Sequence, residues 1–276
     1  MIDLHCHILP GIDDGAPDLA SSLAMARLAL DDGIEVTACT PHIYPGVYEN
    51  DAAGIRKGME AFSQSLLEHN LPLKLVEGAD THVAPQLVRQ LRDDLVPTLN
   101  RSRYFLLEPP HHTPPPRFDE YVFNIFAAGY VPIITHPERL RWIEDHYTTF
   151  VAMAQQGVWM QLTAGSLTGH FGSRPRYWAE RMLNEGLVHI LASDGHGVSK
   201  RPPTMSAGRD VAATHLGTEE AKHLVWTRPL AVIHNCAPES IPPIPILDSS
   251  STPKTRSISF DGIGQWLSRL TRKHRS

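Results

Sequence analysis

The chain has 276 residues, 42% of them hydrophobic, which is enough for one large α/β domain or two small ones. Its net charge of −5 is uneven, because residues 254–276 carry six basic side chains against one acidic one, leaving −10 on the rest. An acidic body excludes broad nucleic-acid binding, which requires a basic surface. There is no apolar run of 18 residues and no signal-peptide pattern at the N-terminus, so we expect a cytoplasmic protein.

The cysteines exclude another class of chemistry. Their low and odd number, three, fits a reducing compartment and argues against a disulfide framework. Cysteine-based phosphate chemistry uses a Cys-x5-Arg loop, but the sixth residues after the three cysteines are Ile12, Pro45 and Pro242. Thiol-dependent phosphatase chemistry is therefore disfavoured.

Strand-like and helical patterns alternate along most of the chain. Apolar, strand-like runs lie at 2–4, 35–40, 73–77, 104–107, 131–135, 158–162 and 189–192. Between them lie helical patterns at 19–32, 55–69, 85–94, 118–128, 148–156 and 175–185. Asp18 is a typical N-cap for the first helix, and Gly33 is placed to end it. Seven strand-like runs with helical patterns between them predict a parallel sheet, either open or closed into a barrel.

The composition changes after residue 236. Residues 237–259 are rich in Pro and Ser and are expected to be a linker. In the basic tail at 260–276, apolar residues recur at helical spacing, which predicts a short amphipathic helix. The segment 260–275 could contact an anionic membrane surface, placing the protein at the inner face of the plasma membrane, or it could be an unstructured end. We therefore expect a single domain over 1–236.

Histidines and carboxylates recur at the ends of the predicted strands. In the run His5-Cys6-His7 both imidazoles leave one face of the first strand. The other candidate ligands follow this or later strands: Asp14, His42, Asp80, Glu108, His136, Asp194 and His196. In α/β folds the chemistry sits at the carboxyl ends of parallel strands. Ligands contributed by nearly every strand converge only in a closed or nearly closed barrel, which favours that architecture over an open sheet.

This set of side chains predicts a cluster of metal ions. Imidazole and carboxylate together suit divalent ions such as Mn²⁺, Fe²⁺ or Zn²⁺. A carboxylate such as Glu108 at the end of an apolar strand is costly to desolvate unless a cation accompanies it. Nine candidate ligands exceed the four of a tetrahedral site, so we expect two or three ions.

Clustered divalent ions point to phosphoryl chemistry, because they activate water near neutral pH and neutralise a transferring phosphoryl group. Two arginines support this reading, since a guanidinium matches phosphate oxygens bidentately. Arg139 is expected to bind phosphate, although it could instead pair with Glu138 or Glu144. Arg201, which precedes two prolines, could bind phosphate or be structural.

Some polar residues near these motifs receive other roles. Asp13 lies in Gly-Ile-Asp-Asp-Gly and is interpreted as a turn residue. His111 and His112 are expected in a proline-dense loop near the mouth of the site, where they could touch substrate. The remaining histidines of interest are interpreted as surface or packing residues: His82, His170 and His189.

The order of these motifs resembles the PHP (polymerase and histidinol phosphatase) superfamily. Asp-Asp-Gly and Val-Pro-Thr-Leu-Asn at 96–100 are most similar to its bacterial protein-tyrosine phosphatase branch. The resemblance covers about 1–236 and implies a distorted (β/α)7-type, TIM-like barrel. It also implies a trinuclear site, usually holding manganese or iron, with the nine residues above as ligands and Arg139 and Arg201 binding phosphate. One departure is Asp80, where the family pattern usually has Glu, which puts metal spacing and occupancy in question.

The resemblance further implies hydrolysis of phosphotyrosine on an autophosphorylating bacterial tyrosine kinase that controls capsule or exopolysaccharide export. Two alternatives remain open at this point. One is a small-molecule phosphatase, acting for example on histidinol phosphate. The other is an inactive, metal-loaded regulator that only binds a phosphotyrosine tail. An oligomer is compatible with any of these functions.

Overall fold

The computed structural model describes residues 1–248. The tail predicted at 260–276 and residues 249–259 of the predicted linker lie outside this range. Within it, strands and helices alternate from the N-terminus onward, and the predicted α/β class is confirmed.

All strand pairs in the two sheets are parallel. A three-stranded sheet has the order β1-β2-β4, and a six-stranded sheet has the order β3-β5-β6-β7-β8-β9. The strands are β1 (Ile2–Cys6), β2 (Val36–Cys39), β3 (His42–Ile43), β4 (Lys74–Glu77), β5 (Asp80–His82), β6 (Tyr104–Glu108), β7 (Val131–Thr135), β8 (Trp159–Thr163) and β9 (Ile190–Ala192). Each of the seven predicted strand regions contains a strand, and β3 and β5 are additional.

The two sheets join into one curved, barrel-like surface. Two residues separate β3 from β2, and two separate β5 from β4, so each pair behaves as one bent strand. At the other edge, the amide of His7 donates to the carbonyl of Gly195 at 2.9 Å, and the amide of Asp194 donates to the carbonyl of His5 at 2.8 Å. These bonds place the end of β1 beside the residues that follow β9. Seven strand positions therefore follow one another along a curved surface, and these bonds link its first strand to the segment after its last.

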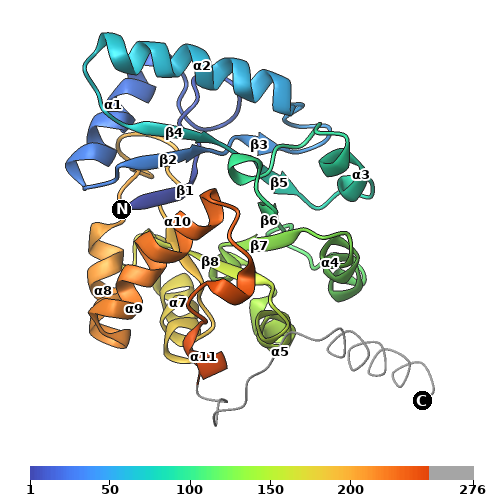
Figure 1. The fold of residues 1–276 in the computed structure, drawn as a ribbon. Helices are drawn as coiled ribbons and strands as arrows, with labels where there is room; N and C mark the ends of the chain where they lie inside the picture. The colour runs from blue at the N-terminus through green and yellow to red at the C-terminus, as the bar shows by residue number, and fades with distance from the viewer. Residues whose placement is uncertain (249–276) are drawn as a thin grey trace, which may run out of the picture.

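Helices surround the strands (Figure 1). They are α1 (Leu19–Asp31), α2 (Ala52–Glu68), α3 (Leu87–Arg92), α4 (Phe118–Ala127), α5 (Ile143–Gln155), α6 (Ala164–Leu167), α7 (Ser173–Asn184), α8 (Ser206–Leu216), α9 (Thr218–Lys222), α10 (Arg228–Ile233) and α11 (Pro245–Asp248). The predicted caps of α1 are confirmed, because Asp18 accepts from the Ser21 amide at 2.8 Å and Gly33 has φ +84°. No helix in residues 1–248 has both the length and the apolar character needed to cross a bilayer.

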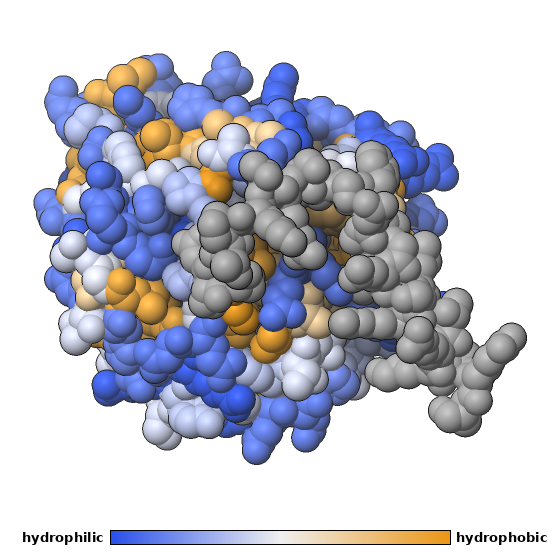
Figure 2. All heavy atoms as spheres, turned by 60° about the horizontal axis from the view of Figure 1, so that its bottom comes forward, coloured by the Kyte–Doolittle hydropathy of each residue, from blue (hydrophilic) through white to orange (hydrophobic). Residues whose placement is uncertain are grey.

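The core divides into two clusters on opposite faces of the strands. Along β6, Tyr104 and Leu106 belong to one cluster, whereas Phe105 and Leu107 belong to the other. Because side chains alternate along a strand, Glu108 continues the face of Tyr104 and Leu106. An apolar layer therefore precedes the acidic strand end. On the outside, the face in Figure 2 shows separate apolar patches among hydrophilic side chains.

The packed body extends beyond residue 236, where the linker was expected to begin. Ile241 and Ile244 are buried, and the fully buried Arg228 donates to the carbonyls of Pro242 at 2.9 Å and Pro243 at 2.6 Å. Prolines supply carbonyl acceptors without amide donors of their own. This part of the proline-rich stretch is therefore fixed to the domain by a buried guanidinium.

Candidate metal centre

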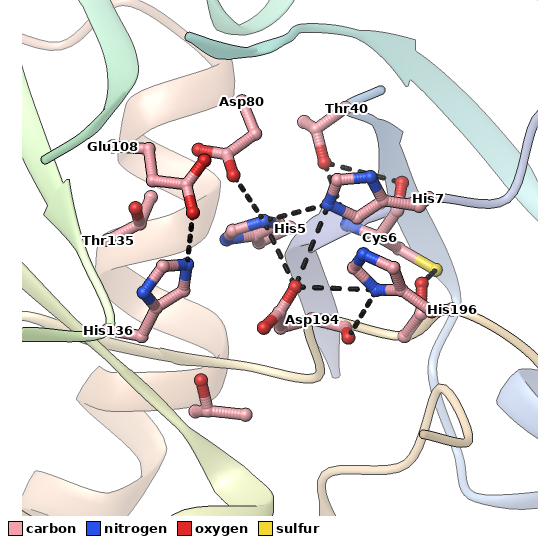
Figure 3. A network of polar contacts seen from close by, with 12 residues as sticks. His5, Cys6, His7, Thr40, Asp80, Glu108, Thr135, His136, Asp194 and His196 are labelled. Carbon is pink, nitrogen blue, oxygen red and sulfur yellow. Dashed lines mark hydrogen bonds and ion pairs between the residues drawn. The ribbon is translucent and has the colours of Figure 1, made fainter. Parts of the chain in front are cut away.

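The nine predicted ligands converge at the carboxyl ends of the strands. Figure 3 shows imidazoles and carboxylates from β1, β5, β6 and the segments after β7 and β9 turned toward one another. They form overlapping groups whose ligand atoms all lie within 4.8 Å of one another: His7, Asp14, His42 and His196; His5, His7 and Asp80; His5, His136 and Asp194; His42, His82 and Glu108; Glu108, His111 and His136. The structure therefore brings together every residue of the predicted set and adds His82 and His111.

The bends between β2 and β3 and between β4 and β5 place His42 beside Asp80. The two residues are paired in register, and the Asp80 Oδ2 lies 3.4 Å from both His42 Nδ1 and His5 Nε2. Gly78 occupies the second bend, where a Cβ would lie 2.8 Å from Leu99 and 2.9 Å from Thr40. Asp80 thus reaches two neighbouring imidazoles despite its short side chain.

Asp13 does more than form the predicted turn. Its Oδ1 accepts from the Gly15 amide at 2.9 Å, as a turn residue would. Its Oδ2 accepts from His7 Nδ1 at 2.7 Å and from the His42 amide at 3.0 Å. Because a carboxylate only accepts, His7 carries its proton on Nδ1 and presents Nε2 to the cluster.

Gln161 orients His5 in the same way and was missed in the sequence. Its Oε1 lies 2.9 Å from His5 Nδ1, at the inner face of β8. The buried amide oxygen accepts a hydrogen bond from His5 Nδ1. His5 Nε2 therefore faces the carboxylates of Asp80 at 3.4 Å and Asp194 at 3.3 Å. The only signal was a polar residue inside an otherwise apolar strand.

Glu108 is surrounded by histidines. Its Oε2 lies 3.3 Å from His42 Nδ1 and contacts His82, and its Oε1 lies 3.2 Å from His111 Nε2 and 3.7 Å from His136 Nε2. Burial opposes ionisation of Glu108, but the surrounding imidazoles outweigh it and hold its pKa well below the usual range. The interpretation of His82 as a surface or packing residue was therefore wrong, whereas His111 lies at the mouth as predicted.

Asp194 links the cluster to both arginines. Its Oδ1 lies 3.3 Å from His5 Nε2 and 3.5 Å from His196 Nδ1, and its Oδ2 accepts from Arg139 and Arg201. Burial would raise the pKa of Asp194, but His5 and the two guanidinium groups hold it well below its usual value. The backbone here is left-handed, with φ of 52°, a conformation that is costly outside glycine and clusters at functional sites.

Arg139 does not use the alternative partners considered from sequence. The carboxylate of Glu138 accepts instead from the Thr163 amide at 3.0 Å and the Ser166 hydroxyl at 2.7 Å. The guanidinium of Arg139 lies over the Phe171 ring at 4.5 Å while it donates to Asp194. Arg139 is thus held at the edge of the cluster.

Several buried polar atoms of the cluster have no hydrogen-bond partner within the described chain. They are both carboxylate oxygens of Asp80, Glu108 Oε2, His42 Nδ1, His136 Nδ1 and His196 Nε2. Unpaired buried polar atoms are costly and uncommon in proteins. Imidazole and carboxylate ligands bind divalent ions at about 2.0–2.2 Å, which places neighbouring ligand atoms at separations like those seen here. The donor set therefore fits a cluster of divalent cations.

A pocket of about 260 Å³ opens onto this cluster. Its lining is formed by Asp14, His42, Tyr44, Val47, Tyr48, His82, Glu108, His111, His136, Arg139, Asp194 and Arg201. A larger, mostly apolar groove of about 670 Å³ between α2, β4 and α10 contains none of the cluster residues. Ligands and arginines thus face the same small cavity.

Residues 1–234 match the family model for capsular polysaccharide synthesis proteins of the CpsB/CapC type. The chain belongs to the CpsB/CapC family. One relative is the tyrosine-protein phosphatase YwqE of Bacillus subtilis, 35% identical over 201 residues, which are 73% of this chain and 79% of YwqE. Another is the tyrosine-protein phosphatase CpsB of Streptococcus pneumoniae, 28% identical over 84% of this chain and 98% of CpsB.

Solved structures agree with this CpsB/CapC assignment. A structure from work on YwqE of Bacillus subtilis and CpsB of Streptococcus pneumoniae, described as unique metal-dependent tyrosine phosphatases, matches with a TM-score of 0.82. Its sequence identity is 32%, and the match covers 86% of this chain and 96% of the other. A probable 2-pyrone-4,6-dicarboxylic acid hydrolase of Acinetobacter baumannii, 13% identical with a TM-score of 0.53, shares only the fold.

Proposed function

We propose that this chain is a metal-dependent phosphatase that hydrolyses phosphotyrosine on an autophosphorylating bacterial tyrosine kinase. In this proposal it regulates capsule or exopolysaccharide synthesis or export. The observation that carries the proposal is that nine candidate ligands converge in one cluster, and that five of them line a pocket of about 260 Å³ together with both arginines. Its support from relatives is that YwqE and CpsB are named tyrosine-protein phosphatases.

The proposed cofactor is a set of two or three divalent ions, Mn²⁺ in the first place, with iron or zinc as alternatives. They would be held by His5, His7, Asp14, His42, Asp80, Glu108, His136, Asp194 and His196. When bound, such ions supply positive charge at the phosphoryl group and lower the pKa of water.

The two arginines are proposed to hold the phosphoryl group. Both now donate to Oδ2 of Asp194, and phosphate oxygens are acceptors of the same kind. The stacking of Arg139 on Phe171 fixes one guanidinium before substrate arrives. Guanidinium groups aimed at the equatorial oxygens would offset the charge that develops in the transition state.

The leaving group determines whether the chain must supply a general acid. Tyrosinate has a conjugate acid with a pKa of ~10, so it departs more easily than an alkoxide. A dedicated general acid is therefore less necessary, and we nominate none. Asp13 and Gln161 act as positioning residues, because they fix the protons of His7 and His5 away from the cluster.

A turnover assay tests the proposal against its rivals. Purified protein with Mn²⁺ would be assayed on p-nitrophenyl phosphate, a phosphotyrosine peptide and histidinol phosphate. We expect the peptide to be cleaved, chelator and His136→Ala to abolish turnover, and thiol alkylation to have no effect. Preference for histidinol phosphate would support the small-molecule alternative, and peptide binding without turnover would support an inactive regulator.

We further propose that the protein acts in the cytoplasm, near the inner face of the plasma membrane. The basis is the charge of residues 260–275, together with the expectation that an autophosphorylating kinase of export systems is membrane-bound. Flotation with anionic liposomes, comparing the full chain with a chain ending at residue 250, tests this. Equal behaviour of the two would refute membrane contact through the tail.

A further inference from the structure

One wall of the pocket differs chemically from the rest. Nine of its twelve lining residues carry a carboxylate, an imidazole or a guanidinium. The remaining three, Tyr44, Val47 and Tyr48, come from a single segment, 44–48. A substrate that buries apolar surface in this pocket must therefore place it against this segment, which we call the 44–48 ledge.

The 44–48 ledge is a hydrogen-bonded turn. The Tyr44 amide donates to the Tyr48 carbonyl at 3.0 Å, and the Tyr48 amide donates back to the Tyr44 carbonyl at 2.8 Å. The Val47 amide also donates to the Tyr44 carbonyl at 2.9 Å, and Gly46 supplies the positive φ of 83° that follows a proline in such turns. The position of Val47 at the tip is thus set by the backbone before any ligand binds.

The rings of the 44–48 ledge are fixed against the cluster itself. Tyr44 stacks on His82 with ring centroids 3.8 Å apart and planes 8° from parallel. Tyr48 stacks on His42 at 5.6 Å and 13°. Since both histidines contact Glu108, the ledge has a defined position relative to the candidate metal centre.

The outer side of the 44–48 ledge is open to solvent. Tyr44 is 40% exposed and Val47 is 57% exposed, although both are large hydrophobic side chains. Apolar side chains that rim a polar pocket are typical of binding sites, in which a few polar groups fix orientation and apolar contact adds affinity. This surface is available to the part of a substrate that projects from the phosphate.

We propose that Tyr44 and Val47 receive the phenyl ring of the substrate and make the site selective for aryl over alkyl phosphate monoesters. This inference rests on the proposed phosphatase function and names the substrate class of the same site. With phosphate at Arg139 and Arg201, an attached aromatic ring can pack on the tyrosine face and the valine. A phosphoserine side chain has only one methylene to offer there. Tyr44 and Val47 are therefore specificity-determining residues.

The test separates ring binding from phosphate binding by using two ligands with the same head group. Calorimetric titration of the Mn²⁺-loaded full chain with phenylphosphonate and with methylphosphonate gives a ratio of dissociation constants. We expect the wild type to favour phenylphosphonate, and Tyr44→Ala and Val47→Ser each to reduce that preference by roughly five- to tenfold. In both variants the affinity for methylphosphonate and the metal content should equal those of the wild type. Tyr44→Phe keeps the ring and should therefore retain the preference for phenylphosphonate. Leu67→Ala removes an exposed apolar side chain of α2 outside this pocket and serves as the matched control.

Kinetics on two peptides complete the test. Tyr44→Ala and Val47→Ser should lower kcat/KM for a phosphotyrosine peptide while leaving any turnover of the matching phosphoserine peptide unchanged. If the wild type cleaves phosphotyrosine but neither variant changes the phosphonate preference, the ledge has no role in selectivity and the phosphatase function stands. If the wild type prefers phenylphosphonate but cleaves neither peptide, the ledge binds aryl groups and the proposed hydrolysis is wrong.

Discussion

Asp13 and His7 are joined by a 2.7 Å hydrogen bond between the carboxylate Oδ2 and the imidazole Nδ1. Both side chains are fully buried. The loop that carries Asp13 packs tightly on the strand that carries His7, since a Cβ at Gly15 would lie only 2.2 Å from the His7 carbonyl oxygen. A single loop thus supplies both a candidate ligand, Asp14, and the group that orients another.

Asp13→Asn is expected to weaken metal binding without removing any candidate ligand. The amide loses the negative charge that holds the proton of His7 on Nδ1, and loss of such an outer partner costs about 10–100-fold in metal affinity. Titration calorimetry with Mn²⁺ measures the effect. Asp31→Asn, which removes an equal charge from an exposed position of α1, is the control. Equal affinities in the two variants would show that Asp13 is only a turn residue.

Arg139→Ala and Arg201→Ala are expected to lower kcat/KM for a phosphotyrosine peptide by about 10²–10³-fold each, the effect typical of losing a transition-state donor. Lysine at either position should recover only part of the loss, because an ammonium cannot form the bidentate fork. Arg141→Ala removes a neighbouring exposed guanidinium and should be nearly silent. A loss below threefold in both alanine variants would remove the arginines from the mechanism.

Substitutions of Asp80 test whether its carboxylate is needed to bind metal. Neither of its oxygens has a hydrogen-bond partner in the described chain, so its buried charge depends on a cation. We expect Asp80→Asn to lose bound metal, and Asp80→Glu to keep it because the carboxylate remains. Elemental analysis after gel filtration gives metals per chain. Full occupancy in Asp80→Asn would show that this side chain is not a ligand.

The metal-free protein is expected to lose stability as the pH rises. Burial opposes protonation of His5 and His42, but the nearby carboxylates outweigh it and raise both pKa values to about 9. Because unfolded histidine titrates near 6.5, this stabilisation is complete below about pH 6.5 and disappears as the pH passes through 9. Burial also raises the pKa of Glu138 to about 7, which acts in the same direction.

Urea unfolding at pH 6, 7.5 and 9 measures this trend. With chelator, the free energy of unfolding should fall between pH 7.5 and 9; below that range His7 and His136, whose pKa values burial lowers, act in the opposite direction. With Mn²⁺ the fall should be reduced or reversed, because metal binding favours the deprotonated imidazoles and strengthens with pH. Rising stability from pH 7.5 to 9 in chelator would contradict the assigned environments of His5 and His42.

Much of the site was predictable because parallel strands end at one edge. His136, Asp194 and Glu108 each follow or end an apolar run, and a run of that kind is visible in the sequence. His42 and Asp80 were predicted as ligands, but their own short strands, β3 and β5, were not. Strands of two and three residues carry no periodic signal, and they form here because the sheet bends.

The rest depended on tertiary contacts. His82 and Gln161 contact the cluster because they lie on the inward faces of their strands, which spacing alone does not reveal. The carboxylate of Asp13 accepts one hydrogen bond within its turn and another from the His7 imidazole. Helices α8 to α11 were not predicted, and neither was the role of Arg228, which binds the proline-rich segment from within the core. Arginine is rarely buried unless its guanidinium is paired, and the hydrogen-bond partners of Arg228 are not evident from the sequence.

Anomalous scattering from crystals of the Mn²⁺-soaked protein, recorded at the manganese edge, tests the central claim most directly. The arrangement of the nine candidate ligands predicts two or three peaks among their side chains, which are His5, His7, Asp14, His42, Asp80, Glu108, His136, Asp194 and His196. Elemental analysis should give the same number of metals per chain. The absence of any peak there, in crystals whose dissolved protein still hydrolyses phosphotyrosine after exhaustive chelation, would contradict a metal-dependent site.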